Sequence, residues 1–364
     1  MTTERRQHQH HGISDRTRRN SFIAATICIL INIGSVLARD NDDDDRDGAR
    51  TGAYCSATAD LLFRACGAEG SDDYFKAQAL CVNVSDDAAR KTCLNEAKTV
   101  RREGSKLCND QLVGRHEACK SLGEGRFDPT FEPSAFDVDF THPVHINPYF
   151  PLKIGHKWEY LGNSERVKIE ILNRTKLIQG VTCVVFRDRV FKDGQLAEDT
   201  DDWFAQAKNG DVYYCGEEVK DYEHFDGDKP KVGELVKIDG SFKWGRNGDK
   251  GGIFFRGLPR KGEVYREEFS PRNAEDVSEV LSTSYQFGLD TELDRHVPPH
   301  LVNLLCHGDC IVTKNLNLNE PSALARKFYA RGIGNILEVN MVTGETVQLI
   351  NCNFDTRCAS LPKP

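Results

Sequence analysis

Six cysteines lie symmetrically about a midpoint in the first third of this 364-residue chain. The intervals between neighbours are 11, 15, 12, 15 and 11 residues, over Cys55, Cys66, Cys81, Cys93, Cys108 and Cys119. Steps of 11 and 15 residues return to nearly the same side of an α-helix, which turns by about 100° per residue. The spacing therefore predicts two antiparallel helices whose facing sides carry the disulfides Cys55–Cys119, Cys66–Cys108 and Cys81–Cys93.

The local sequence agrees with a helical hairpin over residues 51–122. Residues 83–87 predict a turn followed by a helix start, with Ser85 as the N-cap. Gly67 and Gly70 leave open a break in the first helix, in which case three or four shorter helices would carry the same pairs. The hairpin resembles the twin CX9C hairpins of small oxidised proteins in architecture only. Two thin helices bury little core, so disulfides are the expected source of their stability.

The N-terminal residues 1–38 predict a signal peptide. A basic stretch precedes the uncharged residues 21–38, and the last three of these fit a signal-peptidase site. An uncleaved membrane anchor is the alternative, because this uncharged segment is just long enough to span a bilayer. The acidic residues 39–50 predict a disordered segment.

Charge disfavours nucleic acid as a partner. Without residues 1–38, the chain has 43 Lys and Arg against 54 Asp and Glu, a net charge of −11. A protein of this charge is repelled by phosphate backbones. No second hydrophobic span follows, so no membrane span is expected after signal cleavage. The expected partner is an unknown protein or a small hydrophobic ligand.

Export would place the chain in an oxidising compartment, either secreted or periplasmic. Twelve cysteines follow the signal, an even number that suits complete pairing. The six in the C-terminal half are Cys183, Cys215, Cys306, Cys310, Cys352 and Cys358. Proximity favours Cys183–Cys215 between neighbouring strands, then Cys306–Cys310 and Cys352–Cys358, although other pairings stay open.

After a predicted linker over 123–150, residues 151–352 show the alternation of β-strands, and residues 353–364 are expected to form a C-terminal tail. The predicted strands are Val167–Leu172, Val181–Phe191, Asp202–Ala207, Val212–Tyr214, Val264–Phe269, Val277–Tyr285, Ile311–Leu318, Lys327–Ala330, Ile336–Val339 and Thr346–Ile350. Ten to twelve short strands at this spacing predict an antiparallel barrel, half-barrel or sandwich. The expected fold class is therefore α+β.

The start of this β domain also carries a resemblance. Residues 147–152 (Asn-Pro-Tyr-Phe-Pro-Leu), followed by Gly155, Trp158 and Tyr160, resemble the opening of secreted bacterial proteins with a C-terminal antiparallel β domain. The resemblance covers about residues 147–350. It implies export and an antiparallel sheet, such as the half-barrel of periplasmic lipoprotein carriers, and it implies no reaction and no site residue.

Two segments suggest metal ligands. His296, His300, Cys306, His307 and Cys310 offer imidazole and thiolate groups that suit zinc or copper, although Cys306 and Cys310 are explained more simply as a disulfide. Asp43, Asp45, Asp47 and Gly48 match the front half of a calcium loop, but Tyr54 stands where the closing Glu is needed. A protein without a cofactor is the leading expectation.

No nucleophile, phosphate-binding or redox motif is present, which favours a non-enzymatic protein. The acid pairs Asp201-Asp202, Glu217-Glu218 and Glu267-Glu268 are interpreted as solvated strand edges, because adjacent strand residues point to opposite faces. The leading hypothesis is an exported protein whose β domain binds a ligand or partner and whose hairpin is a rigid spacer or docking arm. The alternatives are a metal-binding protein using residues 296–310 and an extracytoplasmic hydrolase.

Overall fold

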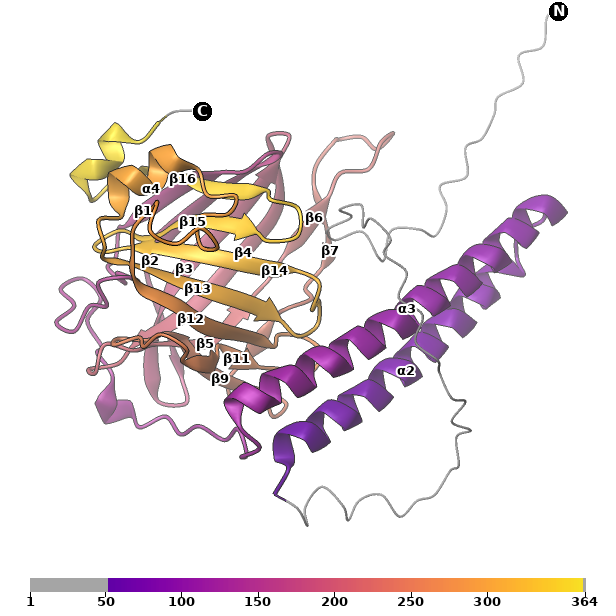
Figure 1. Cartoon of the computed structure of the whole chain (residues 1–364). Helices are drawn as coiled ribbons and strands as arrows, with labels where there is room; N and C mark the ends of the chain where they lie inside the picture. Colours follow the sequence, from indigo (N-terminus) through magenta and orange to yellow (C-terminus); the bar gives the residue numbers. More distant parts are fainter. Residues whose placement is uncertain (1–51, 363–364) are drawn as a thin grey trace, which may run out of the picture. The chain divides into compact units, whose positions relative to one another are not determined.

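A computed structural model describes residues 52–362 (Figure 1). The predicted signal peptide 1–38, the acidic segment 39–50 with its candidate calcium residues, and the last two residues of the chain lie outside the described residues. The chain divides into two compact units, 1–113 and 114–364. Within the described range, no helix has the length and hydropathy that crossing a bilayer requires.

The first unit is a helical hairpin. Helices α2 (Tyr54–Cys81) and α3 (Asp87–Leu122) are joined by Cys66–Cys108 and Cys81–Cys93, whose Cα atoms lie 5.7 and 5.5 Å apart. These two pairs confirm the mirror relation in the sequence, and the other two cysteines of the set, Cys55 and Cys119, are also disulfide-bonded. The two cross-links hold the helices along one seam, where each constrains the unfolded chain.

The helix ends follow local chemistry closely. Helix α2 is continuous through Gly67 and Gly70, so the break that the glycines left open is absent. Helix α3 begins one residue later than the predicted cap would place it, because Asp86, rather than Ser85, accepts a hydrogen bond from the Ala89 amide at 2.8 Å. A carboxylate at this position also interacts favourably with the positive end of the helix dipole.

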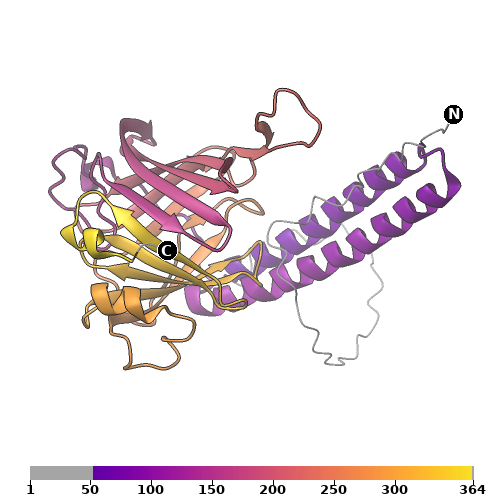
Figure 2. The ribbon, with the colours of Figure 1, turned by 90° about the horizontal axis from the view of Figure 1, so that it is seen from above.

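The second unit is built on a single antiparallel sheet of sixteen strands that curls into a nearly closed barrel (Figures 1 and 2). The strands are β1 (Lys157–Leu161), β2 (Glu165–Ile178), β3 (Val181–Lys192), β4 (Gln195–Gln206), β5 (Val212–Glu218), β6 (Asp221–Glu223), β7 (Glu234–Lys237), β8 (Phe242–Lys243), β9 (Lys250–Phe255), β10 (Val264–Arg266), β11 (Glu268–Phe269), β12 (Asp276–Tyr285), β13 (Cys310–Asn317), β14 (Leu324–Ala330), β15 (Gly334–Asn340) and β16 (Thr346–Cys352). Three short helices complete the fold: η3 (Pro133–Ala135), α4 (Pro299–Leu305) and η4 (Thr356–Ser360).

The order of the strands explains the curvature. The main path runs β10-β12-β13-β14-β15-β16-β1-β2-β3-β4-β5-β9-β11, so the N-terminal strand β1 lies between β2 and the C-terminal strand β16. At the two ends of the path, β9 and β11 approach β10 and β12 and nearly close the ring. Closure leaves few free strand edges, and each strand then has one face inside and one outside.

The strand predictions were incomplete, since β1, β6, β7 and β8 were not predicted and β2 extends six residues beyond its predicted end. Strand β4 begins at Gln195, seven residues before the predicted start, and β9 was not predicted. In β4 the inward positions Glu198, Thr200 and Asp202 are polar, which hides the usual alternation of apolar and polar residues. In β9 the pair Gly251-Gly252 reads as a turn, yet Gly252 packs against the carbonyls of residues 266 and 267, where a side chain would collide.

The segments predicted as a linker and a tail are folded parts of the barrel unit. From residues 123–150, Phe136 joins an outer core with Trp203 and Trp244, and Phe140 joins the main core. Beyond β16, Leu361 is also buried. Both segments carry widely spaced apolar residues instead of a periodic pattern, so composition predicts a loop although tertiary packing orders them.

The disulfides of the barrel unit are the three pairs expected from the sequence, but Cys183–Cys215 does not join neighbouring strands. Cys183 lies on β3 and Cys215 on β5, with β4 between them. Cys215 is the extra residue of a β-bulge opposite β4, and the small buried side chain of Ala205 leaves room for the bridge. Cys306–Cys310 and Cys352–Cys358 close short loops.

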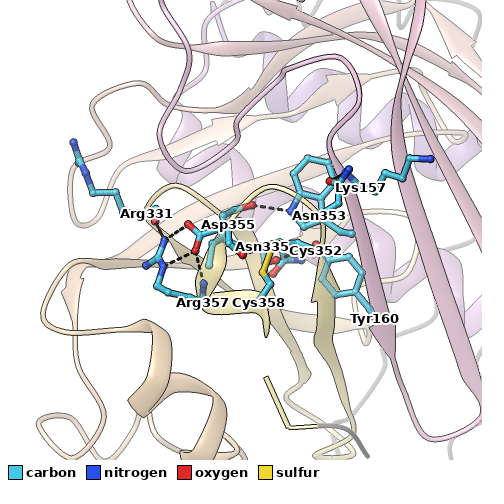
Figure 3. The surroundings of a disulfide bond; sticks show 11 residues. Lys157, Tyr160, Arg331, Asn335, Cys352, Asn353, Asp355, Arg357 and Cys358 are labelled. Carbon is cyan, nitrogen blue, oxygen red and sulfur yellow. Dashed lines mark hydrogen bonds and ion pairs between the residues drawn. A yellow bond between two sulfur atoms is a disulfide. The ribbon is translucent and has the colours of Figure 1, made fainter. Parts of the chain in front are cut away.

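Figure 3 shows how Cys352–Cys358 holds the end of the chain. Arg357 donates to the Asp355 carboxylate at 2.8 Å and to the Arg331 carbonyl at 2.6 Å. The Asn353 side chain accepts from the backbone amide of Lys157 at 2.8 Å. These contacts fix residues beyond β16 to the start of β1 and to the turn after β14.

The last turns of α3 belong to the barrel unit. Ala118 packs with Val277 of β12 and with Leu318, just after β13. Arg115 donates from Nε to a carboxylate oxygen of Glu275 at 3.0 Å, and both side chains are almost fully buried. A buried pair of opposite charges therefore fixes this part of α3 to the sheet.

Candidate functional site

The interior of the barrel divides into two zones along the strands. The first, here called the aromatic zone, consists of Phe150, Phe186, Phe204 and Phe254, whose ring centroids lie 4.7–5.6 Å from their neighbours in the group. On β3 and β4, the next inward positions beyond Phe186 and Phe204 are acidic. Because side chains alternate between the two faces, carboxyl groups and phenyl rings share the same interior.

The second zone contains six inward-facing carboxyl groups on the two sides of β9, where the ring nearly closes. Three come from β3, β4 and β5, and three come from β11, β12 and the residue between β10 and β11. We call them the interior carboxyls: Asp188, Asp202, Glu217, Glu267, Glu268 and Asp276. Because all six occupy inward positions of one nearly closed ring, the two groups face a common space, and the charge of Asp276 raises the pKa of Glu217.

Asp202 and Glu217 stand directly opposite each other on β4 and β5. The Tyr214 hydroxyl donates to Asp202 Oδ1 at 2.5 Å. Burial raises the pKa of Asp202 to about 7, and burial together with the Asp202 charge holds the pKa of Glu217 well above its ordinary value. This pair therefore carries protons at neutral pH where surface carboxyls carry none.

On the other side of β9, Glu267 accepts hydrogen bonds from Ser278 and from Asn315, the latter at 2.7 Å. Glu268 accepts from the backbone amide of Asp276. Burial raises the pKa of all three carboxyls, that of Asp276 to about 7. Hydrogen bonds that favour the charged forms of Glu267 and Glu268 do not offset the loss of water.

Two of the interior carboxyls have an oxygen that accepts no hydrogen bond. Asp276 Oδ1 and Asp188 Oδ1 are buried and unpartnered. Burial and then the charge of Asp202 raise the pKa of Asp188 well above its ordinary value. A buried carboxyl oxygen without a donor costs free energy, so these atoms are available to a donor brought in by another molecule.

Lys327 on β14 is the one basic residue among the groups that most strongly influence these six pKa values. Its Nζ lies 3.8 Å from Glu338 Oε2 on β15, and the two side chains retain 23% and 40% of their surface. Burial alone would lower the pKa of Lys327, but Glu338, Tyr329, Glu267 and Asp276 raise it. With one ammonium group against six carboxyls, the zone becomes negative as the carboxyls lose their protons.

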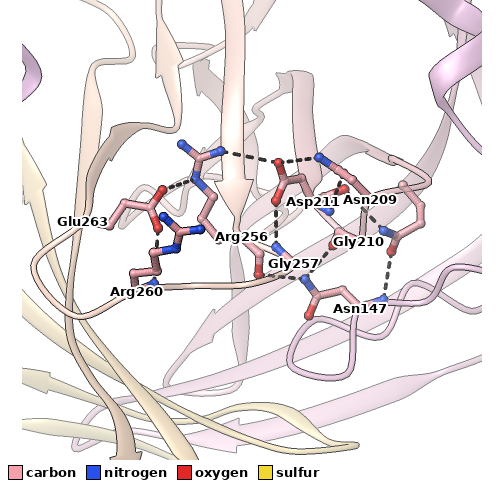
Figure 4. Close-up of polar contacts among 9 residues, drawn as sticks. Asn147, Asn209, Gly210, Asp211, Arg256, Gly257, Arg260 and Glu263 are labelled. Carbon is pink, nitrogen blue, oxygen red and sulfur yellow. Dashed lines mark hydrogen bonds and ion pairs between the residues drawn. The ribbon is translucent and has the colours of Figure 1, made fainter.

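Asn147 lies beside the aromatic zone, since its side chain bonds the amide of Phe150, and Figure 4 shows its polar contacts. Its fully buried amide donates to the carbonyls of Gly210 and Arg256 at 2.8 and 3.0 Å. Its Oδ1 accepts from the amides of Tyr149 and Phe150 at 2.8 and 3.1 Å. One side chain thus joins the segment before β1 to the β4–β5 turn and the end of β9.

Replacing Asn147 by alanine is expected to lower the free energy of unfolding by about 2–3 kcal/mol, because four backbone groups lose their partner inside the protein. Urea titration of the wild-type and variant proteins measures the difference. Replacement of the exposed-loop residue Asn163, which makes one hydrogen bond to Glu345 at 3.1 Å, is the control and should cost under about 0.5 kcal/mol. Equal losses in the two variants would contradict the role of Asn147.

The structure does not bring the predicted metal ligands together. Cys306 and Cys310 form a disulfide, which removes both thiolates, and His300 and His307 are exposed. Across residues 52–362, no three His, Cys, Asp or Glu side chains are grouped to hold a metal ion. His296 lies beside Gly344 and has a positive φ of 64°. The disulfide between Cys306 and Cys310 therefore accounts for the two closely spaced cysteines that had suggested a metal site.

The interpretation of the acid pairs as solvated strand edges was half right. Asp201 and Glu218 face outward, where they pair with Arg174 and Lys220, but Asp202 and Glu217 face the interior. Glu267 and Glu268 are both buried although they are adjacent, because the strand is interrupted between β10 and β11. A regular strand would have sent one of them outside. Only the pairing of the strands reveals that these acids meet.

No protein-family model, curated protein or solved structure matches this chain. The resemblance of residues 147–350 to secreted bacterial β domains therefore stays a prediction. The site is defined by its own geometry: an antiparallel barrel with an aromatic zone, six interior carboxyls and one lysine.

Proposed function

We propose that this chain is an exported, non-enzymatic binding protein whose barrel interior holds a small ligand. The observation that carries the proposal is the row of carboxyl groups at inward positions, where a barrel that only needs to be packed has apolar side chains. Polar residues in such a position cost folding free energy, which a binding role would explain. The aromatic zone beside them supplies apolar contact for the rest of the ligand.

Export is supported by the cysteine chemistry. Twelve described cysteines are all disulfide-bonded, which is typical of secreted and periplasmic proteins and rare in the cytosol. The signal peptide predicted at residues 1–38 agrees with this location. The stapled hairpin then serves as a rigid arm for a partner protein, since its two long helices are held by cross-links instead of a large core.

The test uses the full chain and a neutral apolar fluorophore, N-phenyl-1-naphthylamine, at pH 5, which is below the raised pKa values of Asp202 and Asp276. We expect saturable one-to-one binding with enhanced emission. Val347 on β16 packs against the main core, and Val347→Trp should abolish binding by filling the interior. The matched control Thr346→Trp changes the adjacent residue on the opposite face and should bind as the wild type does. Equal binding by both variants, with the fold retained by circular dichroism, would refute an interior site.

A hydrolase is the second candidate, because Asp202 and Glu217 face each other across β4 and β5. Directly opposed strand residues have Cβ atoms about 4.5–5.5 Å apart, a separation that allows two carboxyls to flank one bond. A panel of p-nitrophenyl glycosides tests this alternative. Turnover that Glu217→Gln abolishes and Glu218→Gln leaves intact would favour the hydrolase, whereas no release of nitrophenol supports the binding role.

A further inference from the structure

We infer that the ligand of the barrel interior is an organic cation, with an ammonium or guanidinium group at the interior carboxyls and an apolar body on the aromatic zone. This inference rests on the proposed function, because it specifies the chemical class that the same site would accept. Four observations lead to it: the charge balance, the unpartnered oxygens, the contact between the two zones and the proton linkage.

The charge balance of the interior is strongly one-sided. Six carboxyls face the common space, and the basic side chain among them, Lys327, is already engaged by Glu338 at 3.8 Å. Buried charges in proteins are ordinarily paired with an opposite charge. Once the carboxyls ionise, an anionic ligand would add to their repulsion, whereas a cation would relieve it.

The unpartnered oxygens point to a donor that the chain itself does not supply. Asp188 Oδ1 and Asp276 Oδ1 are buried and accept no hydrogen bond. They come from β3 and β12, which lie far apart along the sheet, so the deficit is not confined to one strand pair. Ammonium and guanidinium groups carry several N–H donors each and no acceptor, which is the complement that these oxygens need.

Tyr214 connects the two zones. Its ring stacks on Phe204 with centroids 4.8 Å apart, and its hydroxyl donates to Asp202. A molecule whose charged group reaches Asp202 would therefore have its adjoining atoms beside the rings of Tyr214 and Phe204. Aromatic faces attract cations and pack well against alkyl groups, so the apolar part of an amine would pack well against these two rings.

Proton linkage gives the inference a second readout. The groups that face Asp276 are Glu267 from between β10 and β11, Glu268 on β11, Glu217 on β5, Lys327 on β14, Glu338 on β15 and Glu320 before β14. Except for Lys327, all are acidic, so a neighbouring cation would favour ionisation of Asp276. Binding of a cation should therefore release protons, and the affinity should rise as the pH increases through about 7.

The experiment compares octylammonium with octanoate, two probes with the same apolar chain and opposite charges, by isothermal titration calorimetry on the full chain at pH 8. We expect octylammonium to bind at least about tenfold more tightly, which corresponds to about 1.4 kcal/mol. Repeating the titration in buffers of different ionisation enthalpy should show proton release on binding at pH 7.

Matched variants locate the charged end. Glu217→Gln should weaken octylammonium binding at pH 8 by about tenfold, while Glu218→Gln on the outer face of the same strand should leave it unchanged. Because glutamine keeps the size of the side chain, Glu217→Gln also relieves repulsion and is expected to fold.

The outcomes separate this inference from the proposed function. Octanoate binding as tightly as octylammonium, or octylammonium binding that Glu217→Gln does not change, would overturn the cationic ligand while leaving an interior site. Neutral fluorophore binding without any octylammonium binding would do the same. Failure of the fluorophore and of both octyl probes to bind would remove the proposed function itself.

Discussion

Replacing Arg115 by alanine should lower the free energy of unfolding by about 3–5 kcal/mol, because it leaves a buried carboxylate without its counter-ion. Arg115 and Glu275 retain 3% and 1% of their side-chain surface, so water cannot replace the lost guanidinium. Arg115 also donates to Asn319 Oδ1 at 3.1 Å. Urea titration monitored by tryptophan fluorescence of the barrel unit measures the change.

Two variants show whether charge is the cause. The double replacement Arg115→Met with Glu275→Leu should recover most of the loss, since well-packed apolar residues often substitute for a buried ion pair. Arg174→Ala breaks the 2.6 Å pair with Asp201 on the outer face, where the arginine side chain is 56% exposed, and should cost under about 1 kcal/mol. If Arg115→Ala cost no more than Arg174→Ala, the buried pair would not be what fixes the end of α3.

Raising the pH from 5 to 8 should lower the free energy of unfolding by about 2–4 kcal/mol, the reverse of the usual behaviour of carboxyl-rich proteins. Burial raises the pKa of Asp202 and Asp276 to about 7, and that of the other interior carboxyls above the ordinary range as well. Urea titrations at several pH values measure the slope.

The sign follows from proton uptake. Between pH 4 and 7 the folded chain holds protons that the unfolded chain has released, so protonation favours folding there. This contribution is complete below the unfolded pKa of about 4 and is lost as the pH rises through the folded value. His156 acts in the opposite direction, because burial lowers its pKa, but it is one group against six.

Adjacent residues provide the control for the pH effect. Asp202→Asn removes one interior carboxyl and should flatten the slope, whereas Asp201→Asn on the outer face should leave it unchanged. A stability that rises between pH 5 and 8 in the wild type, in the absence of ligand, would show that the interior carboxyls are ionised at no cost.

The disulfide framework was largely predictable. Two of the three hairpin pairs follow from the mirrored intervals alone. Because the rise per residue in a helix is constant, cysteines at equal distances from the turn lie side by side on the two helices. The α+β class and the antiparallel sheet also follow from the change of period after residue 150. The disulfide Cys183–Cys215 was predicted as a pair. However, it spans the intervening strand β4 at a β-bulge that the sequence pattern does not predict.

The candidate site was not predictable in the same way. Sequence reasoning placed Asp202 and Glu217 on solvated edges. Asp202 stands two residues from the buried Phe204, which was a signal that it faces the interior, whereas the bulge at Cys215 changes the phase between Tyr214 and Glu217, so Glu217 gave none. Glu267 and Glu268 gave no such signal, because an interruption changes the phase between them. Of the candidate metal ligands, Cys306 and Cys310 form the disulfide that was the simpler expectation for that segment.

The sequence by itself determined the elements whose causes are local: two long helices, their cross-links, an acidic overall charge and a run of antiparallel strands. Only the tertiary structure decided that the sheet nearly closes, that residues 123–150 and 353–362 pack onto it, and that acids of β3–β5 and of residues 267–276 share one interior. The physical reason is that alternation specifies two faces of a strand, whereas only closure of the sheet decides which face is inside.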